Sequence, residues 1–534
     1  MDKPNESNAQ RDVHLSKAND SALPALVFRE DFLMMPLDLA LSSMPAVFTE
    51  KELVCLMKHL EHAISSSSTE ELMQGTIHYW LTCALHGAIL VEAPRLARAV
   101  VEVFHKIAKK DPEVAVALLQ KTINTGTFHG QTMCYAWINA LYSATFDVHN
   151  SSVIMAIHYV FLHLLENDGR NMIDLLTHRL SEGKEQGNTA LLLLARALLQ
   201  TAGETDIYQP NTTLIAEFVV NLMARFPLLI GSEITQDINQ GSFDGKSILY
   251  VLVCALKALS NENSTSDEVN RLCSIFTTIN HTDNQQNLAN ALLKKIDSGP
   301  YRAANTLHIL LKALVSAIYI RHNDAVIERL ITCLQDLFAT HQNQISLSLS
   351  EPIDMGKYIH ENGIQMLMQT LMVASDRQLD TTALAGLISS MIDTDPDQLP
   401  LAFIHCIPES NDKYNQRSPL RLLIGALDHS PIDSTQRDNI MRIITKLASN
   451  QRAVEMVSSL PSQERTIFID EIAKINPISL LERAHLMALD YSQVTQLSHR
   501  ATEPDRFFTK SATNSEIPAP ATVSTDKREE KGPA

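Results

Sequence analysis

Glycine and aromatic residues are scarce in this sequence. Its 534 residues include 17 Gly and 2 Trp, and aromatic residues make up 5% of the chain. Few glycines together with abundant Leu, Ala and Ile favour helices over sheets. Few aromatic residues also disfavour sugar- or polyprenyl-binding pockets, whose walls rely on large rings.

No pair of cysteines is spaced as CxxC, and the total of seven is odd. Wide, irregular spacing of this kind is typical of buried thiols in a reducing compartment and excludes a disulfide framework. The cysteines are Cys55, Cys83, Cys134, Cys254, Cys273, Cys333 and Cys406.

Long apolar runs and a secretory signal are also missing. Apolar stretches such as Ala190 to Leu199 reach only about ten residues and are interrupted by Arg196, whereas a helix needs about 20 to cross a bilayer. The N-terminal residues Met1 to Asp20 are polar and contain no apolar core. We therefore expect a soluble, cytoplasmic protein without a membrane span.

Basic clusters are limited to pairs of Lys or Arg, and the formal net charge is -17. Nucleic acid would be repelled by such a surface unless one face were locally basic. No nucleic-acid partner is predicted.

Catalytic and metal-binding motifs do not occur: the sequence contains no GxSxG, HExxH or DDxxD. The histidine pairs His59/His62 and His158/His163 have no further ligands at zinc spacing and are typical of surface or core positions. No catalytic, cofactor-binding or metal-binding residue is predicted, and we expect no cofactor and no enzymatic activity.

One segment comes close to a phosphate-binding loop. Residues Gly241 to Ser247 read GxxxGKS, one residue short of the required GxxxxGK[ST], and no predicted strand precedes them. Gly130-Gln131-Thr132 and Gly187-Asn188-Thr189 occupy the same place in other parts of the chain. The segment is therefore interpreted as the start of a repeated helix.

That helix recurs every 56 to 58 residues. Its marker is a Leu preceded by a small residue, Ala in six cases and Thr370 in one, with Leu or Trp four positions earlier and, in five of the seven cases, Leu or Ile seven positions earlier. Offsets of 0, 4 and 7 place these side chains on one helical face. The marker leucines are Leu85, Leu141, Leu198, Leu256, Leu314, Leu371 and Leu427.

Nine residues before each marker stands a residue type that favours an N-cap, because its side-chain oxygen can accept a hydrogen bond from the first turn. Pro419 follows the last of them at a position that suits proline. The predicted caps are Thr76, Thr132, Thr189, Ser247, Asn305, Asn362 and Ser418.

Two further helices are predicted in each unit. The second contains the apolar segments Val100–Phe104, Val153–Phe161, Leu214–Leu222, Val269–Phe276, Val326–Leu334, Leu384–Met391 and Ile440–Leu447. The third is shorter and is expected at Pro112–Thr122, Met172–Leu180, Gln286–Ile296 and Gln398–Cys406, with less clear segments at Pro227–Gln240 and Gln342–Met355.

The predicted fold is all-α: an α-solenoid, or superhelix, of about seven three-helix repeats of about 57 residues. The repeat array is assigned to residues 66–462. We expect helical caps at residues 23–65 and 463–500, a disordered N-terminus at residues 1–22 and a disordered tail at residues 501–534.

This plan resembles armadillo and HEAT repeats in architecture, above all the three-helix armadillo unit. The units here are longer than the roughly 33–47 residues of ankyrin, tetratricopeptide, HEAT and armadillo repeats, and the motifs of those families do not match. The Leu-rich helices and the polar tail around Arg528-Glu529-Glu530-Lys531 resemble bacterial effectors that are translocated into host cells. That resemblance implies export without a secretory signal peptide.

Two functions follow from such an array. Stacked helices form a long surface suited to protein partners, which predicts a monomeric interaction scaffold or adaptor. The alternative is an enzyme on an α/α toroid, in which the helical hairpins close into a ring around a central cleft.

Overall fold

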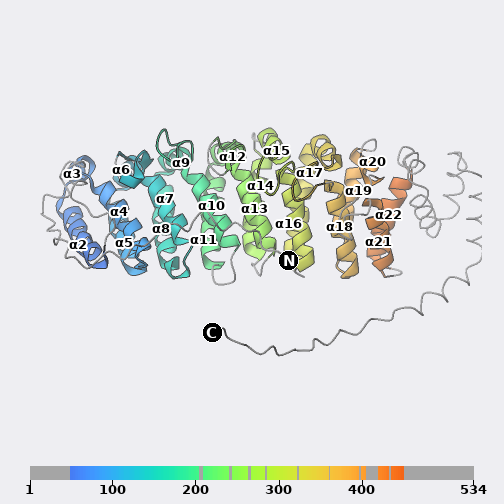
Figure 1. Ribbon diagram of the computed structural model, residues 1–534, viewed down its shortest axis with the longest axis horizontal. Coiled ribbons are helices and arrows are strands. Elements are labelled where there is room, and N and C mark those ends of the chain that lie inside the picture. The colour runs from blue at the N-terminus through green and yellow to red at the C-terminus, as the bar shows by residue number, and fades with distance from the viewer. Residues whose placement is uncertain are drawn as a thin grey trace, which may run out of the picture. The chain divides into compact units, whose positions relative to one another are not determined.

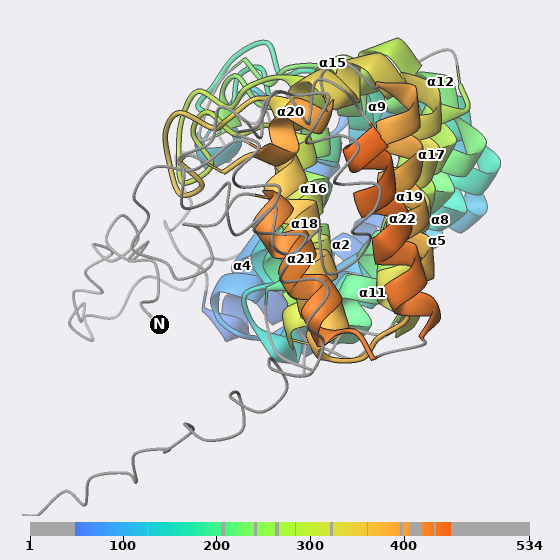
Figure 2. The same cartoon turned by 90° about the vertical axis from the view of Figure 1, so that its right-hand side faces the viewer.

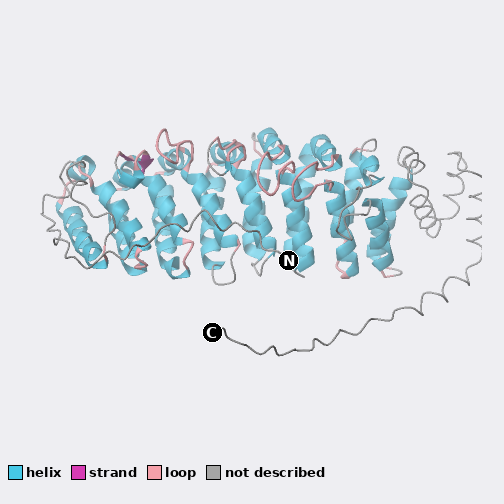
Figure 3. Ribbon diagram, in the orientation of Figure 1, coloured by secondary structure: helices cyan, strands magenta, loops and turns pink. Residues whose placement is uncertain are grey.

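The computed structural model describes residues 49–449, except 125, 204–208, 240–242, 262–265, 283–284, 321–323, 360, 396–398, 405–418 and 432–433. Helices dominate the described chain, and its one paired sheet consists of the two-residue strands β1 (Thr122–Ile123) and β2 (Gln131–Thr132), which are antiparallel (Figure 3). The protein is all-α, as predicted.

The chain divides into two compact units, residues 1–340 and 341–534. The division falls inside α17 (Asp324–Ser350), where His341 leaves the helical region with φ −123° and ψ 33°. The two units are described separately below.

The repeated helix is present at all seven predicted places. Five copies lie in the first unit and two in the second. The copies are α4 (Ile77–Leu90), α7 (Met133–Ala144), α10 (Ala190–Ala202), α13 (Ile248–Asn261), α16 (Thr306–Ile320), α18 (Gly363–Asp376) and α21 (Pro419–His429).

Five of the seven predicted N-caps are confirmed by a side-chain hydrogen bond to the backbone N–H three residues later. They are Thr132, Thr189, Ser247, Asn305 and Asn362, with bonds of 2.7 to 3.3 Å. The prediction for Thr76 is wrong: this residue has ψ 15° and makes no capping bond, and its Oγ1 accepts from Trp80 Nε1 at 3.1 Å. Ser418 lies outside the described residues.

The second and third helices follow in the predicted order. The second helices are α5 (Pro94–Lys110), α8 (Ser151–Asn167), α11 (Gln209–Arg225), α14 (Ser266–Asn280), the first part of α17, α19 (Thr382–Thr394) and α22 (Thr435–Ser449). The third helices are α6 (Pro112–Gln120), α9 (Gly169–Thr177), α12 (Pro227–Thr235), α15 (Gln285–Leu293) and α20 (Leu399–Ile404).

Within the first unit, each helix packs against the helix three places further along the chain. The first helices contact one another in the order α4, α7, α10, α13 and α16, the second helices in the order α5, α8, α11 and α14, and the third helices in the order α6, α9, α12 and α15. Three rows result, and they can be followed in Figure 1 and, end on, in Figure 2. Successive copies of one sequence pattern therefore occupy equivalent layers.

The marker residues form the core of these rows. Leu85, Leu198, Leu256 and Leu314 are fully buried, and Leu141 is 3% exposed. The small residue before each of them is also fully buried, which lets the neighbouring helix approach closely while the leucines fill the space between helices.

The second unit repeats this packing on a smaller scale. There α18 contacts α21, α19 contacts α22, and the short α20 packs against α18, α19 and α21. The marker residues Leu371 and Leu427 are buried, as is Thr370.

At the N-terminal side, α2 (Glu50–Ser66) and α3 (Thr69–Gln74) precede the first marker helix. Each begins with a capping box, formed by Thr49 with Glu52 and by Ser68 with Glu71. Because α2 packs against α5 and α3 against α6, they occupy the places of a second and a third helix ahead of α4. The predicted C-terminal cap and both predicted disordered ends lie outside the described residues.

No helix among the described residues is by itself both long and apolar enough to cross a membrane. One consecutive pair, Pro210–Arg225 with Pro227–Thr235, reaches the required length and composition together but is bent by 118°.

Candidate partner-binding face

A short hairpin joins each third helix to the next first helix. In the first unit the backbone N–H two residues before the N-cap donates to the carbonyl of an Ile or Leu seven residues earlier, always at 2.8 Å. The four pairs are Gly130 with Ile123, Gly187 with Leu180, Gly245 with Ile238 and Ala303 with Ile296. In Figure 2 the loops of the first unit project on the side of the first helices.

Positive φ angles make these hairpins possible. Gly130, Gly187 and Gly245 have φ between 74° and 80°, a left-handed conformation that glycine adopts without a steric penalty, and Ala303 takes the same place with φ 64°. Neighbouring hairpins also touch: a Cβ built on Gly130 would lie 2.6 Å from the carbonyl oxygen of Glu182.

A substitution at this contact tests the hairpin row. Gly130→Ala should destabilise the protein by about 1–3 kcal/mol more than Gly245→Ala, because both variants strain a left-handed residue but only the first also forces a backbone clash. At Gly245 the nearest atom to a built Cβ is Asp297 Oδ2 at 3.7 Å. Urea unfolding of both variants measures the difference, and equal losses would contradict the close packing of the two hairpins.

Each hairpin of the first unit places one side chain on the preceding first helix. Four residues before the N-cap, Phe128 packs on His86 of α4, with ring centroids 4.6 Å apart, and Glu185 accepts from the Tyr135 hydroxyl of α7 at 3.3 Å. Phe243 lies below Arg196 of α10, and the Tyr301 hydroxyl accepts from Lys257 of α13 at 2.8 Å. The hairpins and first helices thus form one surface.

Three cations on this surface lie over aromatic rings. Arg196 is 4.8 Å from the ring centroid of Tyr142 and 5.8 Å from that of Phe243. Lys246 is 5.7 Å from Phe243 and 5.2 Å from Tyr250, and Lys257 is 5.0 Å from Tyr301. We call the seven residues Tyr142, Arg196, Phe243, Lys246, Tyr250, Lys257 and Tyr301 the cation–aromatic row.

The row is continuous across three first helices, α7, α10 and α13, and two hairpins. Phe243 and Tyr250 have centroids 6.4 Å apart, and Tyr250 and Tyr301 have centroids 6.5 Å apart. The three cations are half-buried. Burial of its ammonium group lowers the pKa of Lys257.

The other faces of the first unit use their charges differently. Arg225 pairs with Glu166, Arg271 with Glu217 and Lys294 with Asp237. Each pair joins two successive groups of three helices within the first unit. Among the residues that the structure describes, no carboxylate lies within 4 Å of the charged nitrogens of Arg196, Lys246 or Lys257. The row is therefore distinct from the ion pairs that hold the layers together.

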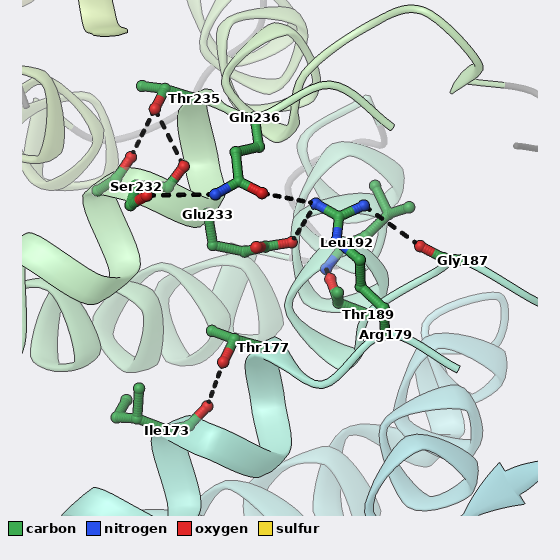
Figure 4. A network of polar contacts seen from close by, with 11 residues as sticks. Ile173, Thr177, Arg179, Gly187, Thr189, Leu192, Ser232, Glu233, Thr235 and Gln236 are labelled. Carbon is green, nitrogen blue, oxygen red and sulfur yellow. Dashed lines mark hydrogen bonds and ion pairs between the residues drawn. The ribbon is translucent and has the colours of Figure 1, made fainter. Parts of the chain in front are cut away.

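A polar network around Arg179 shows this structural use of charge. Arg179 donates to Glu233 at 2.9 Å and to Gln236 at 3.2 Å, and it reaches the Gly187 carbonyl of its own hairpin at 3.5 Å (Figure 4). Burial raises the pKa of Glu233, and Arg179 opposes that shift. The network ties one hairpin to the next third helix and leaves little of Glu233 exposed.

The P-loop-like segment lies within this architecture. Gly245 provides the hairpin turn, Lys246 belongs to the cation–aromatic row, and Ser247 caps α13 by accepting from Tyr250 N at 3.3 Å. The helix-cap interpretation is confirmed.

The histidine pairs gather no ligand set. His158 is buried against Tyr159 and Phe218, and His163 lies near His105, with ring centroids 5.8 Å apart. Within the described part of the chain, no group of three or more His, Cys, Asp or Glu is arranged to hold a metal ion.

Three thiols of the first unit, the buried Cys134 and the half-buried Cys83 and Cys254, are poor nucleophiles. Burial raises the pKa of Cys83 and Cys134 to about 12 and that of Cys254 to about 11. Because the thiolate is the reactive form, these side chains stay protonated and unreactive near neutral pH.

Neither a family model nor a curated protein matches this sequence. The assignment of a function therefore rests on the geometry of the hairpins, the first helices and the cation–aromatic row.

Proposed function

We propose that the protein is an interaction scaffold: an α-solenoid of about seven three-helix units that binds a protein partner along its hairpins and first helices. In this proposal the array spans residues 66–462, the chain acts as a monomer, and it works in the cytoplasm of the cell that contains it. Delivery into a host cell stays a prediction, since the tail that would direct it lies outside the described residues.

The observation that carries the proposal is the registered packing of the first unit. Helices with equivalent positions in successive repeats contact one another, as α4 contacts α7 and α5 contacts α8. Each hairpin contacts the preceding first helix through a side chain. Such an array presents equivalent positions at regular intervals, and solenoids use surfaces of this type for extended contacts with partners.

Small-angle scattering of the full chain tests the architecture. An open superhelix should give an elongated distance distribution with a tail to large distances. A symmetric distance distribution, with a reconstructed shape that is hollow at its centre, would favour the α/α toroid. It would also favour the enzyme alternative.

Site-specific photo-crosslinking tests the function. A benzoylphenylalanine at Phe243, on the proposed face, should capture a partner protein in cells, whereas the same group at the exposed Lys109 of α5 should not. Capture at neither position, or equally at both, would contradict a partner-binding scaffold that uses this face.

A further inference from the structure

We infer that the cation–aromatic row binds an extended acidic peptide segment of the partner, rich in Asp and Glu. This inference rests on the proposed scaffold function and specifies which chemistry the partner brings to it.

Charge is the first argument. The chain as a whole is acidic, with a net charge of -17, yet Arg196, Lys246 and Lys257 follow one another along a single row. The aromatic faces hold these cations in place, and none of the three forms an ion pair with a carboxylate of the described residues. A carboxylate-bearing partner supplies the missing counter-charge.

Burial is the second argument. The three side chains are half-buried and lie over aromatic rings, contacts that restrict their flexible stems before a ligand arrives. Ordering in advance reduces the entropy lost on binding, and the lower local dielectric strengthens each ion pair relative to one in open solvent.

Dimensions favour an extended segment. Neighbouring helices lie about 8–10 Å apart, so the row from Tyr142 of α7 to Tyr301 beyond α13 covers roughly 20–30 Å. An extended peptide advances about 3.3 Å per residue, and six to nine residues, roughly, would cover that length. Carboxylates on alternate residues would then meet successive cations.

Nucleic acid suits the row less well. Three cations are too few for a backbone-binding track on a strongly acidic protein. The rings are in addition covered by Arg196, Lys246 and Lys257 or packed against each other, so their faces are not open to stacking bases.

The test uses the full chain and a fluorescent peptide of about ten glutamates, with binding measured by fluorescence anisotropy. The triple variant Arg196→Gln, Lys246→Gln, Lys257→Gln should lose about tenfold in affinity. A matched control removes three other positive charges, Arg95→Gln, Lys109→Gln and Lys110→Gln, all exposed on α5, and should lose less than about twofold. Thermal melts of both variants establish that they fold.

Several outcomes would overturn the inference: no binding of the glutamate peptide, equal losses in the two triple variants, or tighter binding of an oligouridine of the same length. A partner captured through Phe243 whose binding survives the Arg196/Lys246/Lys257 variant would also overturn it while leaving the scaffold function standing. Failure of the crosslinking experiment alone would instead count against the scaffold.

Discussion

Leu252→Ala should lower the free energy of unfolding by about 2–5 kcal/mol. Leu252 is fully buried in α13, which packs between α10 and α16, and the equivalent residues Leu194 and Leu310 of those helices are also fully buried. Removing its side chain creates a cavity in a layer that supports neighbours on both sides. Urea unfolding followed by circular dichroism measures the loss.

Leu228→Ala provides the matched control. Leu228 belongs to α12, in the same compact unit as α13, but its side chain is 51% exposed. Its removal should change the free energy of unfolding by less than about 0.5 kcal/mol. If Leu252→Ala were as mild as Leu228→Ala, the layered packing of the first helices would be wrong.

Local sequence patterns predicted the helices well, because each pattern is decided within one helix. A polar cap followed by a stripe of buried residues is enough to begin α7, α10 and α13. Thr76 shows the limit of this reasoning. Since α3 ends only two residues earlier, no hairpin brings the chain in along the extended path that a capping residue requires, and the threonine hydroxyl bonds to Trp80 instead.

The break in α17 falls where the sequence predicts a boundary between two helices. A separate third helix is predicted from Gln342, and α17 consists of two helices joined across a kink at His341, the second of which ends at Ser350. The seven-unit solenoid over the whole chain stays a prediction, while the all-α fold and the three helical rows of the first unit do not depend on it.

The sequence also carries a signal for the hairpins, which the caps and apolar stripes do not contain. Before five successive caps, an Ile or Leu stands at offset −9 and a Gly at offset −6, as in Ile123 and Gly126 or Ile296 and Gly299. The cation–aromatic row had none, since its members come from different units. Spacing along the chain cannot show that Arg196 lies over Phe243 or that Lys257 reaches Tyr301.

The protein should lose stability at acid pH because a neutral histidine takes part in the cap of α16. His308 replaces the Glu of a capping box: its Nδ1 accepts from Asn305 N at 3.2 Å, while Asn305 Oδ1 accepts from His308 N at 2.9 Å. This reciprocal pair requires a neutral imidazole, because a protonated ring has no acceptor.

Burial lowers the pKa of His308 from 6.5 to about 3, and the positive charges of Lys312 and Lys295 add to the shift. The folded state therefore resists protonation that the unfolded chain accepts, and stability should fall as the pH drops from the unfolded value of 6.5 towards about 3. Between neutral pH and pH 5, His308 alone should cost about 2 kcal/mol, since each pH unit below the unfolded pKa is worth about 1.4 kcal/mol.

His308→Gln separates this effect from the remaining acid sensitivity. Glutamine keeps an oxygen that can accept from Asn305 N but does not titrate, so the variant should lose about 2 kcal/mol less than the wild type between pH 7 and pH 5. His281→Gln, at an exposed position after α14, should follow the wild type. Urea unfolding at the two pH values measures both differences. Glutamine does not titrate, so the variant must lose any contribution that His308 makes to the acid dependence. If His308→Gln lost as much stability as the wild type between the two pH values, the neutral capping histidine would be wrong.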